Sequence, residues 1–550
     1  MKNAEIISRF EHLEGERRGT VEGVWDEIEK FVLPLRGDFY STLTDEAEVD
    51  WRRREIYDST AVFACQSLAA SLQGNLTSPS QKWFDLRFRD DELNDNDAAM
   101  EWLEDSSERI YQALNESNFD IEIAEAYLDI VGYGTSTLTE EVDEDGKLLF
   151  SAVPVREGFF EENHKKQVHR FYRRLQWTPV QIISKFGEEG VPESIRTKAE
   201  SPSGSTEKHT VIFCIYPREV PKDLDTTKPV AEKARPFGYK YVLKVGQHTL
   251  GEEGGYYEMP AFVSRWRKTS GSRWGHSPAT VALADILMLN QIKEATVEAA
   301  GKAIDPASLV LESALLSDLD LERGGRTIVN DIDGIRPYES GTKFDVANME
   351  ISMLVDSIRN AFFQNQLELK ESPAMTATEV NVRYELMQRL LGPTLGRLKT
   401  DLLDPLIQRS FNILYRAGML EEMPQELTDA ALDIEYNGPL PRAQQSDTAM
   451  AIEQWLMGLG QMAQVFPDAL DLVDTDQAVR TVATLRGVPA KVLLSEQEIE
   501  EKRAKRQQAM ETMQGIQTAQ GAGEAMKAVG EGAQAIQGPE GLAAVPGEAA

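Results

Sequence analysis

Two long helical patterns constrain the fold of this chain more than any other feature. Apolar residues recur three or four positions apart in residues 276–303 and again in residues 346–371, and the repeats contain no internal proline. At a rise of about 1.5 Å per residue, each helix is expected to be roughly 35–40 Å long. The repeating positions are Val281, Ala284, Met288, Ile292, Ala295 and Ala299 in the first helix and Ala347, Ile351, Leu354, Ile358 and Ala361 in the second.

The segment between the two helices, residues 304–345, has strand and turn patterns. Arg326–Val329 reads as a strand, and Asp333-Gly334 and Arg336-Pro337 read as turns. Two long helices that enclose a small β-rich tip make a protruding arm. Because the apolar stripes are too narrow to bury themselves within one chain, we expect the arm to pack against neighbouring subunits.

Residues 1–275 predict one α+β unit. The first helical pattern runs from Ile7 to Phe31 and stops at Pro34. The dipeptide Asp145-Gly146 predicts a hairpin turn, and Thr178-Pro179 predicts a capped start of a short helix. Further helices are expected at 58–73, where Asp58 or Ser59 can cap the N-terminus, and at 97–115 and 120–131. Strands are expected at 135–142, 147–155, 167–174, 209–216, 239–245 and 257–265.

The rest of the chain is expected to be mainly helical. Residues 372–440 begin after the Ser372-Pro373 break, and Thr376 to Glu379 has the spacing of a capping box. That helix is predicted to run toward Leu391-Gly392-Pro393, and another to reach Gly418 with a kink or restart at Asp404-Pro405. Residues 441–509 are predicted to be helical. Residues 510–550, rich in Gly and Ala, are predicted to be disordered or weakly helical.

Charge and composition exclude several classes of protein. The chain has 58 Lys and Arg against 91 Asp and Glu, a net charge of −33 over 550 residues. Such a protein repels polyanions, so ordinary nucleic-acid binding is disfavoured, but an acidic wall suits a conduit along which DNA slides. There is no apolar run long enough to cross a membrane and no apolar N-terminal segment for secretion. Cys65 and Cys214 cannot form a disulfide framework, which fits a reducing cytoplasm.

Patterns typical of catalysis or cofactor binding are weak. We find no phosphate-binding loop, no dinucleotide fingerprint and no zinc-protease motif, and we expect no cofactor. Gly275-His276-Ser277-Pro278-Ala279 resembles a nucleophile elbow, but the polar residues before it favour Ser277 as a helix cap. The six histidines lack ligand spacing. The acidic residues from Asp85 to Asp97 lack the pattern of a calcium loop. We therefore expect the histidines and these acidic residues to lie on the solvated surface.

Basic residues of the arm are the candidate binding residues. Two interpretations are open for them: solvated or intersubunit ion-paired positions, or contacts to phosphates that pass through a channel. The candidate channel contacts are Lys293, Lys302, Arg359 and Lys370, and the candidates at the tip are Arg323, Arg326, Arg336 and Lys343.

Three groups of short motifs, taken in order, resemble the head-to-tail connecting (portal) proteins of short-tailed bacteriophages. The likeness covers about residues 1–440. The family often has a basic turn where this chain has Trp274-Gly275-His276. The motifs are Asp58-Ser59-Thr60-Ala61 with Leu76-Thr77-Ser78-Pro79 and Trp83-Phe84; Trp274 to Pro278 with Ala284 to Leu287 and Leu289-Asn290; and Thr376 to Val380 with Arg383 and Leu391-Gly392-Pro393.

The resemblance implies an architecture and a role. Residues 1–275 would be the wing, 276–303 and 346–371 the two stem helices, 304–345 the clip, 372–440 a channel loop and wing-return helices, and 441–509 the crown. Members form rings, usually of twelve subunits, at one capsid vertex of the virion, and the subunit is not an enzyme. The implied partners are the terminase large subunit, scaffold and major capsid proteins, tail adaptor proteins and double-stranded DNA, with no membrane and with assembly in the host cytoplasm.

Two alternatives remain open from the sequence. Another virion structural protein, such as a tail adaptor or scaffold, is the first, although those are usually shorter and lack two long helices around a β-rich tip. A serine hydrolase centred on Ser277 is the second. It requires a strand ending near Gly275, with a histidine and an acid close to Ser277.

Overall fold

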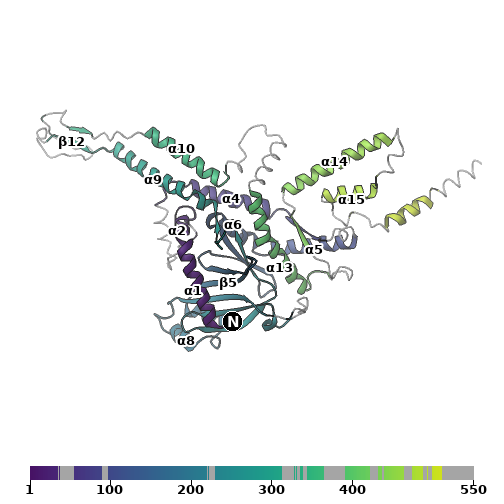
Figure 1. Ribbon diagram of the computed structural model, residues 1–550, viewed down its shortest axis with the longest axis horizontal. Coiled ribbons are helices and arrows are strands. Elements are labelled where there is room, and N and C mark those ends of the chain that lie inside the picture. The colour runs from purple at the N-terminus through teal and green to yellow at the C-terminus, as the bar shows by residue number, and fades with distance from the viewer. Residues whose placement is uncertain are drawn as a thin grey trace, which may run out of the picture. The chain divides into compact units, whose positions relative to one another are not determined.

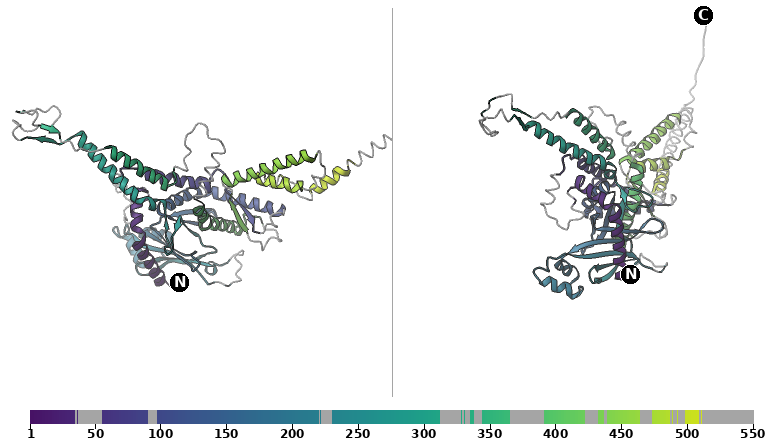
Figure 2. Two further views of the ribbon diagram at one scale, coloured as in Figure 1. Left: turned by 45° about the horizontal axis from the view of Figure 1, so that its top comes forward. Right: turned by 60° about the vertical axis from the view of Figure 1, so that its left-hand side comes forward.

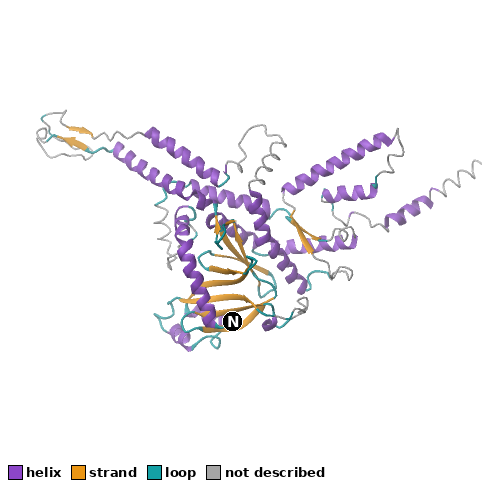
Figure 3. Cartoon of the chain, in the orientation of Figure 1, coloured by secondary structure: helices purple, strands orange, loops and turns teal. Residues whose placement is uncertain are grey.

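The computed structural model describes most of the chain, with gaps. The described residues are 1–34, 36, 55–89, 97–219, 221, 230–311, 328, 330, 335–337, 344–364, 391–421, 432–436, 439–463, 473–486, 488, 492, 498–508 and 510. They form two compact units: residues 1–93 with 102–447, and residues 94–101 with 448–550. Helices and strands are mixed throughout the first unit (Figure 3), so the predicted α+β class is confirmed.

A five-stranded antiparallel sheet forms one core of the first unit. Its order is β4 (Gly158–Glu162), β5 (Val168–Trp177), β6 (His209–Pro217), β7 (Phe237–Leu243) and β8 (His248–Tyr256). Helix α1 (Asn3–Thr20) lies along one face of this sheet (Figure 1). Phe10 packs edge-on against Phe159, with ring centroids 4.8 Å apart. The sequence analysis missed β4 and β8, because glycines and glutamates obscure their alternation.

A three-stranded antiparallel sheet forms the second core. Strand β2 (Thr135–Val142) lies between β3 (Leu148–Val153) and β9 (Ala261–Arg265). The predicted turn between β2 and β3 is confirmed, with Gly146 at φ 82°. Helix α6 (Phe119–Tyr133) packs on β2 and β3, and α4 (Thr60–Leu76) packs on α6. Helix α4 extends beyond Gly74, before which its end was predicted. Strand β9 begins at Ala261, later than the predicted start at residue 257.

The first helical pattern is interrupted. It forms α1 and then α2 (Glu22–Phe31), because Val21 between them leaves the helical conformation at φ −126° and ψ −21°. Helix α7 (Pro179–Phe186) begins at a complete capping box of Thr178 and Gln181, as predicted. Short elements complete the unit: α8 (Glu193–Glu200), the 3₁₀ turn η2 (Glu232–Ala234), β10 (Arg267–Lys268) and β11 (Gly275–His276).

Both predicted arm helices are present, but the second ends at Ala361, ten residues before its predicted end, where Phe363 has a φ of 59°. Helix α9 (Pro278–Ile304) and helix α10 (Phe344–Ala361) lie side by side, and a small sheet of β12 (Ser308–Val310) and β13 (Ile335–Pro337) lies at their far end (Figures 1 and 2). Arg336-Pro337, predicted as a turn, belongs to β13. Residues 365–371, Asp333-Gly334 and most of the predicted strand Arg326–Val329 lie outside the described residues.

The chain then returns through one bent helix. Residues 391–398 are helical, a π-helical turn follows at Lys399–Leu403, and α13 (Asp404–Arg416) continues directly. Pro405 has no backbone N–H to donate, so the helix lacks one hydrogen bond at this position. The π-helical turn directly before Pro405 accommodates the missing donor. The residues before Leu391 lie outside the described ranges, so the predicted boundary at Leu391-Gly392-Pro393 stays a prediction, whereas the predicted kink at Asp404-Pro405 coincides with the π-helical turn. Strand β14 (Leu432–Tyr436) pairs with β1 (Phe84–Phe88), a pairing that the sequence analysis missed.

The described part of the second unit is helical. Helix α14 (Pro439–Ala463) continues into it, and α15 (Thr475–Leu485) and residues 498–508 are helical as predicted. Helix α5 (Asp97–Glu116) begins in this unit and continues into the first. Residues 511–550 lie outside the described residues, so the predicted disorder of the tail stays a prediction. No helix in the described ranges is both long and apolar enough to span a membrane.

Candidate functional site

The arm begins at a junction that the sequence builds from five consecutive residues. Trp274 is buried, and its ring lies 5.2 Å from that of Trp25 and 4.8 Å from that of Phe160. Ser277 caps α9: its Oγ accepts a hydrogen bond of 2.9 Å from the backbone N–H of Thr280 and donates one of 2.6 Å to a backbone carbonyl of α6. Pro278 occupies the first helical turn, so the predicted cap is confirmed.

Two glycines allow the backbone to cross at this junction. A Cβ built on Gly275 would lie 1.9 Å from the carbonyl oxygen of Gly134. Gly134 itself ends α6 in the left-handed region at φ 81°. The backbone N–H of Gly275 also donates to Thr135 Oγ1 at 2.9 Å. No other residue fits at position 275 without moving the backbone, which fixes where the arm leaves the sheets.

The middle of α9 is tied to the segment that precedes α4. The Asn290 side chain donates to the backbone carbonyl of Glu55 at 3.0 Å and accepts from the backbone N–H of Tyr57 at 2.8 Å. Asp58 accepts from the N–H of Thr60 at the start of α4, and its carboxylate lies 3.7 Å from Lys293 Nζ. Two motifs that are far apart in the sequence therefore meet in space.

The two arm helices use their apolar stripes differently. In α10 the predicted stripe packs inward, with Leu354 and Ile358 buried, and Ser357 donates to Asp285 of α9 at 2.6 Å. In α9 the buried positions are different from the predicted stripe, in which Val281 and Met288 are exposed. The expectation that both stripes need a neighbouring chain is thus wrong for α10. A second apolar row on α10 is exposed instead: Val346, Met349 and Met353, the latter two 68% and 59% exposed.

The candidate basic residues have different surroundings. Lys293 is half-buried in its ion pair with Asp58, and Lys302 is exposed, with Glu298 at 4.0 Å as its ion-pair partner among the described residues. Arg359 is exposed, and no ion pair joins it to another described residue. Arg336 is exposed on β13. Lys370, Arg323, Arg326 and Lys343 lie outside the described residues.

Acidic side chains outnumber basic ones on the described arm. Residues 278–311 and 344–364 contain the basic residues Lys293, Lys302 and Arg359, against the acidic residues Asp285, Glu294, Glu298, Asp305, Asp345, Glu350 and Asp356. The net charge of these ranges is therefore negative. Such a surface holds no DNA by neutralising phosphates, and isolated basic positions on it are the points where transient phosphate contact is possible.

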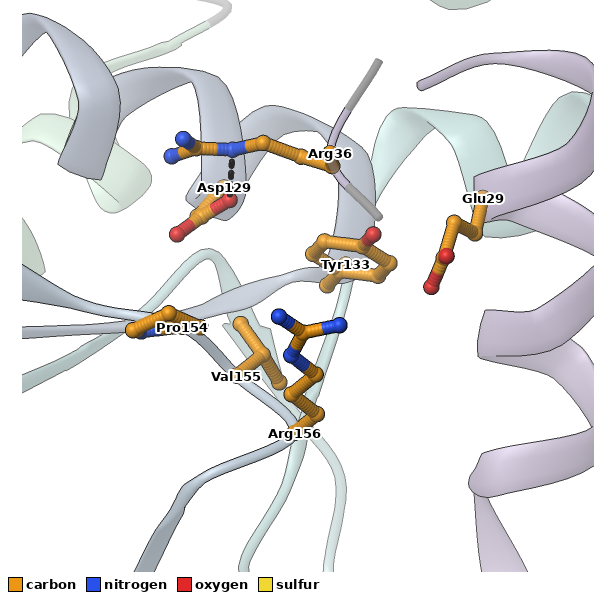
Figure 4. Close-up of a pocket in the computed structure, with 7 residues that line it drawn as sticks. All are labelled: Glu29, Arg36, Asp129, Tyr133, Pro154, Val155 and Arg156. Carbon is orange, nitrogen blue, oxygen red and sulfur yellow. Dashed lines mark hydrogen bonds and ion pairs between the residues drawn. The ribbon is translucent and has the colours of Figure 1, made fainter. Parts of the chain in front are cut away.

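A small cavity with several charged side chains in its lining lies between α2, α6 and the β3–β4 connection (Figure 4). Its volume of about 40 Å³ has room for a few water molecules. Arg36 Nε donates to Asp129 Oδ1 at 2.8 Å across it, and Arg36 also pairs with Glu125. Burial raises the pKa of Asp129 to about 6, although Arg36 opposes the shift. The remaining lining residues are Glu29, Tyr133, Pro154, Val155 and Arg156.

A buried ionic network that the sequence analysis missed holds α13 on the sheets. Arg409 and Glu140 are both almost fully buried, and Arg416 forms a two-bond pair with Glu258 at 2.7 and 2.9 Å. The available signal was Arg409 on the apolar face of a helix, whereas Glu140 lies in the largely polar strand TSTLTEEV and does not stand out there. Neither signal alone indicates a partner.

The hydrolase alternative gains no support from the surroundings of Ser277. Strand β11 does end at His276, as that alternative required. The Ser277 hydroxyl, however, is 1% exposed and hydrogen-bonds with Gly132 and Thr280, not with a histidine or a carboxylate. His276 Nε2 lies 3.3 Å from Thr269 Oγ1. Within the described ranges, no three His, Cys, Asp or Glu residues are grouped to hold a metal ion.

Comparison with known proteins gives a consistent result. Residues 3–494 match a family model described as bacteriophage head to tail connecting protein. The chain is 28% identical over 524 residues to a probable portal protein of Bordetella phage BPP-1, covering 92% of this chain and 91% of that protein. It is 27% identical over 530 residues to the portal protein of Salmonella phage epsilon15, covering 94% of each.

Proposed function

Since this chain belongs to the bacteriophage head-to-tail connecting protein family, we propose that it is a portal subunit that forms a ring-shaped channel at one capsid vertex. DNA passes through the ring during packaging and ejection. The packaging motor, with its terminase large subunit, docks first, and tail proteins dock later. The family match across residues 3–494 is the observation that carries the proposal. It also disfavours a tail adaptor or scaffold, and the capping role of Ser277 disfavours a hydrolase.

The parts of the chain have matching roles in this proposal. Residues 1–275 form the wing, α9 and α10 the stem, residues 304–345 the clip, 372–440 the channel loop and the return to the wing, and 441–509 the crown. The exposed row of Val346, Met349 and Met353 supports contact between neighbouring stems, because apolar rows of this kind are covered in an assembly. Contacts that repeat head to tail close a ring, for which twelve subunits are expected.

The channel wall is acidic in this proposal. Twelve subunits would carry about −400 in total before screening, which lets DNA slide without sticking. Among the candidate contacts, Lys302 and Arg359 are the best placed for passing phosphates, because both are exposed and neither is held by a buried partner. Lys293 has the additional task of pairing with Asp58. Lys370 stays a candidate, as do Arg323, Arg326, Arg336 and Lys343 for contacts of the clip with motor or tail.

Electron microscopy of the purified chain, together with its mass by light scattering, tests the proposal. Rings with a central hole and a mass of about 0.7 MDa are expected for twelve subunits of 61.5 kDa. A monomer or dimer at every salt concentration, also in the presence of scaffold and capsid proteins, contradicts it.

A further inference from the structure

The buried carboxylate of Glu140 occupies an unusual position between β2 and α13. Its side chain is 0% exposed, and Oε1 accepts a hydrogen bond of 2.7 Å from the hydroxyl of Ser410. Its other oxygen, Oε2, lies 3.6 Å from Arg409 Nε, and neither of these two atoms has a hydrogen-bond partner. A fully buried carboxylate therefore has one good hydrogen bond and one loose ionic contact.

The nearest guanidinium is already occupied. Arg409 Nη1 donates to the backbone carbonyl of Glu258 at 3.0 Å and lies 3.3 Å from its carboxylate, and Nη2 lies 3.3 Å from the backbone carbonyl of Glu140. Arg409 thus has a second carboxylate to balance its charge. When Glu140 loses its negative charge, Arg409 is still paired with Glu258. In an isolated ion pair, the same change would leave the guanidinium buried without a counter-charge.

The other charged and titratable groups around Glu140 come from three elements. Helix α13 also contributes Arg416, which holds Glu258 with two hydrogen bonds. Strand β8 contributes Tyr256, whose ring faces Arg409 and whose hydroxyl donates to Glu141 of β2. Tyr257 follows and faces Arg416. Glu140 is fully buried beneath these groups, and separation of α13 from the sheet would open it to water.

We propose that Glu140 is a proton-controlled latch: α13 is held firmly on the β3–β2–β9 sheet while Glu140 carries its proton, and separates more readily when the proton is lost. Separation exposes the carboxylate to water, which solvates the charged form. Burial in the docked state opposes that form, and accordingly raises the pKa of Glu140 to about 7 despite Arg409 and Ser410. The docked state then binds the proton more tightly than the separated state.

The latch has a definite place in the chain. Helix α13 continues from residues 391–403, and both lie within residues 372–440, the range that we assign to the channel loop and the return to the wing. Release of α13 would loosen the attachment of this return to the sheets. The latch itself does not depend on the portal role, because it is a property of Glu140, Ser410 and Arg409 within one chain.

Hydrogen exchange of the full chain at pH 6.0 and 8.5 tests the latch directly. After correction for intrinsic exchange, protection of peptides within 404–416 is expected to fall about tenfold between the two pH values. This change follows if opening releases the one proton of Glu140 and the exposed carboxyl has an ordinary glutamate pKa. In Glu140→Gln, protection is expected to be the same at both pH values within about twofold. Wild-type protection that does not change with pH, or a change that persists in Glu140→Gln, overturns the proposal.

Two further variants separate the latch from general loosening. Glu258→Gln weakens the pairs with Arg409 and Arg416, so protection is expected to fall at both pH values. It also removes a negative charge that raises the pKa of Glu140, so the ratio between the two pH values is expected to become smaller. Ser410→Ala removes the hydrogen bond that favours the charged form, so the midpoint of the transition is expected to move to higher pH. If Glu140→Gln does not fold, an unchanged midpoint in Ser410→Ala overturns the proposal by itself.

Discussion

Gly134 and Gly275 cross so closely that the carbonyl oxygen of one occupies the space where a side chain of the other would begin. A Cβ on Gly275 would lie 1.9 Å from that oxygen. We expect Gly275→Ala to lower the free energy of unfolding by about 3 kcal/mol, because backbone and not a flexible side chain must move. Gly301→Ala is the control: position 301 is in α9 with nothing within 4 Å, and there alanine should be neutral or stabilising. Equal effects in denaturant titrations of the two variants contradict this account.

Asn290 joins the arm to the backbone of residues 55–57 with two hydrogen bonds. Asn290→Ala is expected to lower the free energy of unfolding by about 1 kcal/mol, because one part-buried and one exposed backbone group lose their partner. The neighbouring Gln291 is exposed, so Gln291→Ala should change stability by less than about 0.5 kcal/mol. Limited proteolysis should also show faster cleavage near residue 55 in the first variant only.

Asp129 gives stability a pH dependence with a defined sign. Burial raises its pKa in the folded chain to about 6, from the ordinary aspartate value of 3.8, so the folded state binds the proton more tightly than the unfolded state. The resulting contribution is fully present below pH 3.8 and is lost as pH rises through about 6. Relative to Asp129→Asn, wild type should therefore lose at most about 3 kcal/mol between pH 4 and pH 7. A constant difference between the two chains over this range would refute the assignment.

The exposed row on α10 should matter for assembly and not for folding. Met349→Glu with Met353→Glu is expected to abolish rings in electron micrographs while the circular dichroism spectrum and thermal midpoint stay within about 2 °C of wild type. Val245→Glu is the matched control, since Val245 is 74% exposed at the turn between β7 and β8. Rings that form normally in the double variant would show that neighbouring stems meet elsewhere.

The two exposed basic positions of the stem should affect DNA and not stability. Lys302→Glu with Arg359→Glu is expected to leave the thermal midpoint unchanged and to reduce DNA-filled heads severalfold in a complementation assay, because added negative charge repels passing phosphates. Lys293→Met should instead lower stability by about 1 kcal/mol through loss of the half-buried pair with Asp58. Normal filling of heads by the double variant excludes these two residues as channel contacts.

Features that lie within one element or one turn could be predicted from the sequence. The period of α9, its Ser277 cap and the Asp145-Gly146 turn depend on neighbouring residues only, so pattern and turn chemistry were sufficient. Features that join distant segments left no local pattern: β14 on β1, Asn290 on residues 55–57, and Arg409 beside Glu140. The stripe of α9 was misassigned because alanines and apolar residues lie on more than one of its faces. Burial depends on where α4, α6 and α10 pack, and the helical period does not specify that.

Helix α1 packs on strands that follow it much later in the chain, from Phe159 of β4 to Val242 of β7. A ribosome must therefore synthesise nearly half of the protein before Ile6 and Phe10 find their partners. Until then the apolar face of α1 is exposed on the nascent chain, where a chaperone can bind it. A chain that is released before β7 has been made keeps that face uncovered and is a target for aggregation or proteolysis. The order in which these elements are synthesised thus exposes chains that end before β7 to cellular quality control, whereas longer chains have the partners that cover α1.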